Sequence, residues 1–130
     1  MTPIKILLFS ADASMVHVLS KCIKDAGYKL IHAPNGVGAI DLIQLEKPAL
    51  IILDMELPGV GSLAIIRALR VNVISGRIPV VLMGANMREE DVLIGLEVGA
   101  DLCLLEEFHP QVFIARLRSL IRRTEPTKVY

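Results

Sequence analysis

Four acidic residues follow short apolar runs of the chain, at positions where their carboxylates could act together. They are Asp12, Asp54, Glu56 and Glu106. The carboxyl ends of parallel strands meet at one edge of a sheet, and α/β domains usually bind their ligands there. Carboxylate oxygens are the ligands that hard divalent cations take. An acidic pocket that holds a cation is therefore one hypothesis, although such residues are more often solvated surface acids, and Glu56 is expected to point outward.

The sequence offers little support for an enzyme. It has no glycine-rich phosphate loop and no nucleophile elbow. Its three histidines, His17, His32 and His109, are scattered over a predicted helix, a predicted strand and a helix start, away from the acidic residues. We therefore expect that the chain is not an enzyme.

Short aliphatic runs alternate with amphipathic helical patterns along the whole chain. The runs occupy residues 4–9, 28–33, 49–54, 79–83 and 102–105, and we expect strands there that are buried on both faces. The fourth helix is predicted over about residues 88–98, and the fifth begins at Pro110, a good first-turn residue. Either Asp12 or Ser14 could cap the first helix. This alternation predicts a single doubly wound five-stranded parallel sheet of order 2-1-3-4-5, a flavodoxin-like α/β fold.

Composition limits the partners of this domain. Lysine plus arginine and aspartate plus glutamate number 14 each, so no overall basic field exists to attract nucleic acid or an anionic membrane. The chain enters a strand within its first residues and has no run of about 18 apolar residues, which predicts a cytoplasmic protein. Cys22 and Cys103 are expected to be buried thiols in a reducing compartment. We assign residues 1–123 to one domain and residues 124–130 to a linker or tail.

Several segments resemble bacterial response-regulator receiver domains, the CheY-like family. "KPALIILDMELPGVGSLAIIRALR" resembles the phosphoacceptor segment, with Asp54 at the position of the phosphorylated aspartate. "IPVVLMGA" resembles the fourth strand of the family, and "GLEVGADLCLLEEF" its fourth helix and fifth strand. "HPQVFIARLRSLIRR" is similar to the fifth helix of regulators that carry a winged-helix DNA-binding domain. The resemblance covers nearly the whole chain and implies a receiver fold.

The residues that do chemistry in this family are mostly replaced here. The resemblance places Ser10 and Ala11 at the two acidic positions that hold Mg²⁺, and only the next residue, Asp12, is acidic. Gly84 takes the place of the hydroxyl residue that contacts the phosphoryl group, Glu106 that of the lysine, and Cys103 that of the aromatic switch residue. The resemblance therefore implies a degenerate phosphorylation pocket.

This substitution pattern bears on phosphorylation. Phosphoryl transfer to a carboxylate depends on positioned cations that neutralise the transition state, and this pocket has lost them. We expect no cofactor, a lost Mg²⁺ site and severely slowed phosphorylation of Asp54. Two interpretations of Asp54 stay open: a residual phosphoacceptor, or a carboxylate held for local structure by hydrogen bonds to nearby loop amides. The second is favoured.

The surface of the fourth helix, fifth strand and fifth helix joins two receivers in the winged-helix class through charged pairs. Here Val92, Leu102 and Val112 take positions that are usually charged, while Asp101 and Arg116 keep charges on the same surface. Within the fourth helix, Leu93 and Leu96 are predicted to face inward, with Val92 and Ile94 beside them. An exposed apolar patch there would need a cover, so we expect a homodimer through this surface.

Two functions remain in view. The favoured one is a phosphorylation-independent pseudo-receiver that acts as a dimerisation and regulatory module, with a C-terminal DNA-binding domain outside this chain. The alternative is a stand-alone module that docks onto a histidine kinase or another partner. A weakly phosphorylatable receiver, with Asp54 as acceptor, is the third possibility.

Overall fold

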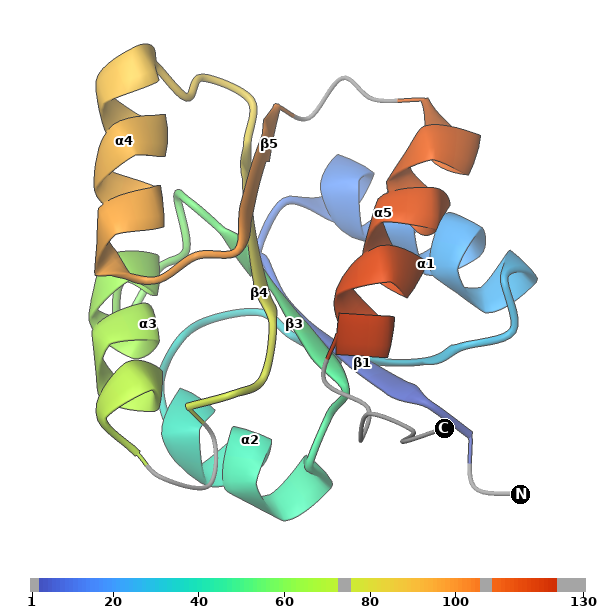
Figure 1. The fold of residues 1–130 in the computed structure, drawn as a ribbon, viewed down its shortest axis with the longest axis horizontal. Helices are drawn as coiled ribbons and strands as arrows, with labels where there is room; N and C mark the ends of the chain where they lie inside the picture. Colours follow the sequence, from blue (N-terminus) through green and yellow to red (C-terminus); the bar gives the residue numbers. More distant parts are fainter. Residues whose placement is uncertain (1–2, 73–75, 106–108, 124–130) are drawn as a thin grey trace, which may run out of the picture.

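Five parallel strands form one sheet in the order β2-β1-β3-β4-β5 (Figure 1). The computed structural model describes residues 3–72, 76–105 and 109–123. The strands are β1 (Lys5–Phe9), β2 (Lys29–Ala33), β3 (Leu50–Asp54), β4 (Val80–Gly84) and β5 (Leu102–Leu105). The predicted fold class and strand order are confirmed, and the predicted strand bounds differ from these by one residue at most.

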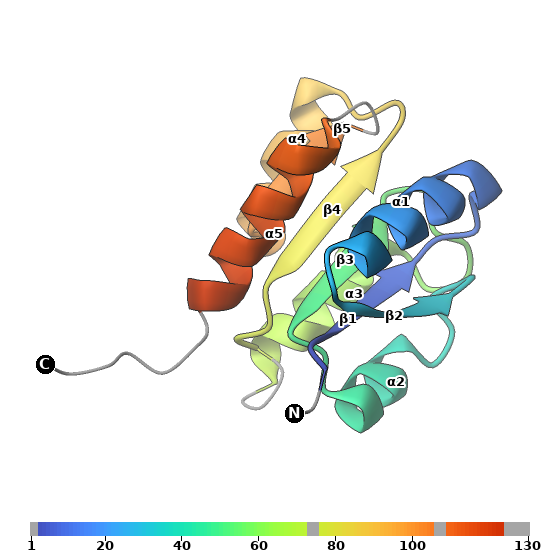
Figure 2. The same cartoon turned by 90° about the vertical axis from the view of Figure 1, so that its right-hand side faces the viewer.

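Helices cover both faces of the sheet. They are α1 (Ala13–Asp25), α2 (Ala39–Glu46), α3 (Ser62–Val71), α4 (Glu89–Val98) and α5 (Pro110–Arg123). Helices α1 and α5 pack on one face, and α2, α3 and α4 lie on the other, as Figures 1 and 2 show. Each face has its own aliphatic core, so the sheet is the middle layer of three. Within the described residues, none of these helices has the length and apolar character needed to cross a membrane.

The prediction that every strand is buried on both faces is correct only for the centre of the sheet. Strands β3 and β4 are buried throughout, and β1 is buried after Lys5. By contrast, β2 and β5 contain no fully buried residue. They are the edge strands, each with one neighbour, and the helices pack mainly over the central strands. An apolar run in the sequence does not distinguish an edge strand from a central one.

The first helix begins directly beside the predicted ligand edge. The Oδ1 atom of Asp12 accepts hydrogen bonds from the backbone amides of Ser14 and Met15, at 2.9 and 3.2 Å. Asp12 is therefore the N-cap of α1, and the choice that the sequence left between Asp12 and Ser14 is settled. Its carboxylate therefore already accepts hydrogen bonds from the first turn of α1.

Arg70, in the last turn of α3, anchors the region around β5. Its guanidinium donates hydrogen bonds to the carbonyl oxygens of Gly76, Ile78 and Gly99. It also forms an ion pair with Asp101 at 2.8 Å, and the same Asp101 oxygen accepts a hydrogen bond from the Val80 amide. One side chain thus joins α3 to the segments that lead into β4 and β5.

Helix α4 packs through a glycine, contrary to the sequence prediction. Gly95 is buried, and a Cβ atom added to it would lie 2.8 Å from Cδ2 of Leu82 in β4. Leu93 and Leu96, predicted to face inward, are 59% and 46% exposed. The absence of a side chain at Gly95 allows the helix to approach the sheet closely, and this turns the two leucines outward.

Candidate functional site

The carboxylate of Asp54 is buried at the end of the central strand β3, where it is 6% exposed. The hydroxyl of Ser10, which follows β1 and is itself fully buried, donates a hydrogen bond of 2.8 Å to Oδ2 of Asp54. The backbone amide of Glu56 donates a hydrogen bond of 3.0 Å to Oδ1. Both carboxylate oxygens therefore have a donor from the protein itself.

Three further contacts hold this pair in place. The Asp12 amide donates a hydrogen bond to Oγ of Ser10 at 3.1 Å, and the Ser62 hydroxyl donates to the backbone carbonyl of Asp54. Nε2 of His32, in β2, lies 2.7 Å from the carbonyl oxygen of Ser10. Because a carbonyl only accepts, Nε2 carries the hydrogen in this contact. Neither the role of Ser62 nor that of His32 could be predicted from the sequence, since both contacts depend on neighbouring strands and loops.

The described acidic residues do not gather into a cation site. Asp12 caps α1, and the side chain of Glu56 is exposed, as expected. In the residues that the structure describes, no group of three or more His, Cys, Asp or Glu side chains could hold a metal ion. Asp54 alone, with both oxygens already hydrogen-bonded, does not fit the oxygen-rich coordination that Mg²⁺ requires. Glu106 lies outside the described residues, so its predicted position beside Asp54 is a prediction still.

The space next to Gly84, at the end of β4, is filled. A Cβ atom at this position would lie 2.9 Å from Cγ of Met87 and 3.2 Å from Cβ of Met55. Met87, whose side chain packs against the core below α3 and α4, was not singled out from the sequence. A hydroxyl side chain at residue 84 would have to displace it.

Neither cysteine is fully buried, which corrects the sequence prediction. Cys22 and Cys103 are both free and half-buried. Burial raises the pKa of both thiols, and the nearby Asp25 carboxylate raises that of Cys22 further. The Cys103 thiol lies 3.8 Å from the carbonyl oxygen of Val92, so the residue at the family's aromatic switch position packs under α4.

The predicted dimer surface is apolar, but through partly different residues. Val112 is 51% exposed, whereas Val92 and Leu102 are partly buried. The larger exposed apolar groups on these elements are Leu93, Ile94 and Leu96 on α4 and Leu105 on β5. Asp101 and Arg116 are exposed, yet the Asp101 carboxylate pairs with Arg70 of its own chain. The charges at this surface are therefore fewer than the sequence suggests.

Comparison with known proteins places this arrangement in a family. The response regulator receiver domain model matches residues 6–118. The phosphate regulon transcriptional regulatory protein PhoB of Pseudomonas aeruginosa is 34% identical over 121 residues, which are 93% of this chain and 53% of that protein. The DNA-binding response regulator MtrA of Mycolicibacterium paratuberculosis is 32% identical over 121 residues, 93% of this chain and 52% of that protein. The chain thus spans about half the length of the curated relatives it matches.

A solved structure agrees. The BeF3-activated N-terminal receiver domain of Klebsiella pneumoniae RstA superposes with a TM-score of 0.84 at 29% identity, over 91% of this chain and 98% of that one. The sheet order and the buried aspartate at the end of β3 are those that the resemblance implied. The chain belongs to the response regulator receiver domain family of two-component signalling.

Proposed function

We propose that this receiver domain works without phosphorylation of Asp54, as a constitutive dimerisation and regulatory module of a cytoplasmic transcription regulator. A C-terminal DNA-binding domain would follow this chain, as the names and greater lengths of its relatives suggest. The domain itself would bind no nucleic acid. In this proposal, dimerisation through α4, β5 and α5 takes the place of a phosphorylation switch.

The hydrogen bond from Ser10 to Asp54 is the observation that carries the proposal. In a phosphorylatable pocket the carboxylate must be free to attack phosphorus, and cations must neutralise the charge that develops. Here the Ser10 hydroxyl and the Glu56 amide already satisfy both oxygens of a buried carboxylate. Such an aspartate is stabilised in its present form, and attack by either oxygen would weaken the hydrogen bond that this oxygen accepts.

The surroundings of Asp54 support the same conclusion. Among the described residues no three or more His, Cys, Asp or Glu side chains gather as a metal site, which supports our proposal that the family's magnesium site is lost. The side chain of Met87 fills the space over Gly84, where the family has a hydroxyl that contacts the phosphoryl group. A phosphoryl group at Asp54 would therefore find no hydroxyl donor at residue 84 and little space beside it.

Phosphodonor chemistry tests this part of the proposal. We expect no mass increase of the intact protein after incubation with acetyl phosphate and Mg²⁺, and no spectral change with beryllofluoride. The matched control is a variant that carries Ser10→Asp, Ala11→Asp and Glu106→Lys, which restores the family's residue types, and this variant should accept phosphate at Asp54. Stoichiometric phosphorylation of the unmodified protein would contradict the proposal and favour the weakly phosphorylatable receiver.

Exposed aliphatic groups around β5 support constitutive dimerisation. Leu93 and Leu96 on α4, Leu105 on β5 and Val112 on α5 are each about half-exposed. Burial of apolar surface contributes about 25 cal/mol per Å², so a few such side chains from each subunit supply several kcal/mol, although lost translational and rotational freedom opposes association. A contact of this kind depends little on ionic strength.

Light scattering at low and high salt tests the dimer. We expect a dimer at both salt concentrations for the unmodified chain and a monomer for Leu93→Glu combined with Leu96→Glu. The matched control is Leu45→Glu, because Leu45 is 75% exposed on α2, away from the proposed interface. A monomeric wild-type chain, or a dimer that survives the double change, would favour the stand-alone module.

A further inference from the structure

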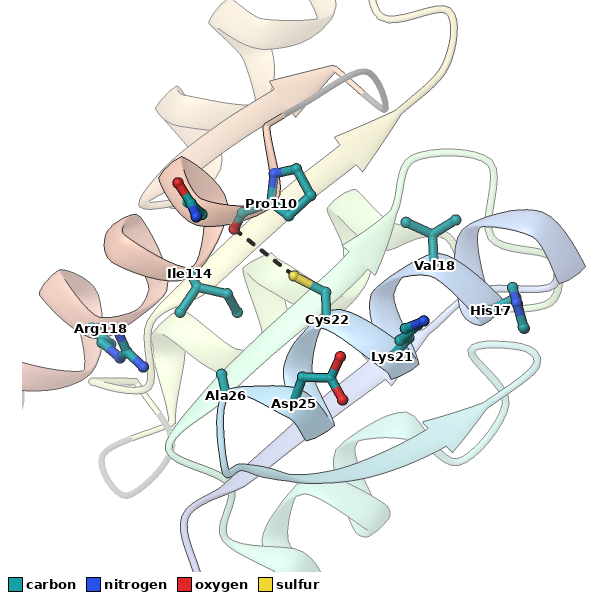
Figure 3. A pocket seen from close by; sticks show the side chains of 10 residues that line it. His17, Val18, Lys21, Cys22, Asp25, Ala26, Pro110, Ile114 and Arg118 are labelled. Atoms are coloured by element: carbon teal, nitrogen blue, oxygen red, sulfur yellow. Dashed lines mark hydrogen bonds between the residues drawn. The ribbon is translucent and has the colours of Figure 1, made fainter.

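A groove lies between α1 and α5, on the face of the sheet opposite α4 (Figure 3). Its volume is about 600 Å³, within the range of small-molecule sites. The residues used below to describe it are Val18, Lys21, Cys22, Asp25, Ile114 and Arg118. None of them takes part in the Asp54 pocket or in the proposed dimer surface.

The middle of the groove is apolar. Val18 is half-exposed on α1, and Ile114 of α5 faces it across the groove (Figure 3). Between them, the thiol of Cys22 lies 3.9 Å from the carbonyl oxygen of Pro110, so the first turn of α5 touches α1 there. Ile114 is already buried, so an apolar chain or ring in the groove would pack on it and remove the exposed parts of Val18 and Cys22 from water.

The edges of the groove carry unpaired cations. Lys21 on α1 and Arg118 on α5 form none of the ion pairs found among the described residues, which join other side chains. Asp25 is the one acidic residue among the described residues that line the groove. Helix α5 carries four arginines and no acid, so its whole length adds positive charge to this side of the domain. The groove thus combines an apolar floor with an excess of positive charge.

We propose that this groove binds a small amphipathic carboxylate. The hydrocarbon body would lie along Val18, Cys22 and Ile114, and the carboxylate would accept hydrogen bonds from Arg118 and Lys21. Arginine presents a planar fork of donors that matches a carboxylate, and lysine adds a second charge. The Asp25 carboxylate repels an anion and therefore weakens binding of the ligand carboxylate. It has a smaller effect on a neutral or zwitterionic ligand. The proposal therefore predicts that removal of the Asp25 carboxylate increases the affinity for the anionic ligand.

Decanoate, below its micellar concentration, is the probe for the first test. We expect amide shifts in the ¹H–¹⁵N NMR spectrum confined to α1 and residues 110–118 of α5, with much weaker shifts from decanol and decylammonium. Arg118→Gln should weaken decanoate binding about tenfold, the loss of one charge-assisted hydrogen bond. Arg123→Gln, at an exposed position in the last turn of α5 outside both the groove lining and the predicted dimer residues, is the matched control and should change binding little. Asp25→Asn should tighten it.

The two cysteines provide a second readout within one molecule. Both thiols are half-buried with raised pKa values, but Cys22 lines the groove and Cys103 lies under α4 on the other face. At mildly alkaline pH, decanoate should slow alkylation of Cys22 and leave that of Cys103 unchanged, as measured by peptide mass spectrometry. Equal protection of both thiols would indicate non-specific binding and overturn the proposal.

Three other outcomes would also overturn it. Decanol could bind as tightly as decanoate, the shifts could centre on Leu93 and Leu96 of α4, or Arg118→Gln could leave affinity unchanged. Binding of an acidic amphipathic peptide without any binding of decanoate would reassign the groove to a protein partner. Each result can be told apart from the phosphorylation and dimerisation tests, because the groove lining contains neither Asp54 nor the exposed leucines of α4 and β5.

Discussion

Replacement of Ser10 by alanine isolates the contact that distinguishes this receiver pocket. The change removes the 2.8 Å hydrogen bond to Oδ2 of Asp54, and it leaves that oxygen of a carboxylate only 6% exposed without its donor. A hydrogen bond to a charged group contributes about 1.5–3 kcal/mol. The amide of Asp12 also loses its acceptor, which adds a smaller loss because that amide is nearer to solvent. We therefore expect the free energy of unfolding to fall by about 2–3 kcal/mol at neutral pH.

Urea denaturation of four proteins measures this contact directly. They are the wild type, Ser10→Ala, Asp54→Ala and the double variant, with Ser14→Ala as a control in which only an exposed hydroxyl is lost. If the hydroxyl stabilises the carboxylate, the double variant should lose less than the sum of the single losses, by about 1.5–3 kcal/mol. Losses that add within about 0.5 kcal/mol would refute the assignment of Ser10 as the donor that satisfies Asp54.

Arg70→Ala should lower the free energy of unfolding by about 2 kcal/mol, because three carbonyl oxygens and Asp101 each lose their contact with the guanidinium. The control Arg67→Ala, on the exposed side of α3, should change it by less than about 0.5 kcal/mol. Equal effects of the two changes in urea denaturation would argue against Arg70 as an anchor. Gly84→Thr should destabilise the fold by about 1–3 kcal/mol, because the new side chain would collide with Met87. Adding Met87→Ala to the same chain should recover part of that loss. If threonine alone left the stability unchanged, the space beside Gly84 would be open. Gly95→Ala should destabilise the fold by about 1 kcal/mol, because the Cβ of alanine would lie too close to Leu82, and this outweighs the better helix propensity of alanine. A rise in melting temperature would contradict the close packing of α4.

Much of the fold could be predicted from the sequence, because the signals for it are local. Five aliphatic runs separated by helical patterns allow few arrangements other than a doubly wound sheet, and the strand order follows from short right-handed connections. Pro110 marked the start of α5, and Asp12 and Ser14 marked the start of α1 without deciding which of them is the cap. These features act through neighbouring residues along the chain, so a linear pattern contains them.

The orientation of α4 could not be predicted in this way. The pattern of Leu93 and Leu96 suggests that both face the core, yet the helix packs through Gly95. Hydrophobic periodicity assigns the inward face to large apolar residues. It has no means of representing a glycine that contributes only by letting two elements come close together. The consequence reaches function, since the two leucines are then available for an interface.

For the candidate site, the residue types alone show which groups of the family are missing, and the folded chain shows what replaces them. Ser10, Ala11 and Gly84 cannot supply the carboxylates and hydroxyl of the family, and that follows from residue type alone. Three contacts depend on the registry of β1, β3 and β4 and on the loops beyond these strands. They are the hydrogen bond from Ser10 to Asp54, the packing of Met87 over Gly84, and the ion pair of Asp101 with Arg70. These contacts join residues 44, 3 and 31 positions apart in the chain. Hydrogen bonds and close packing act over a few ångströms, so distance in space, which only the folded chain defines, decides which of them form.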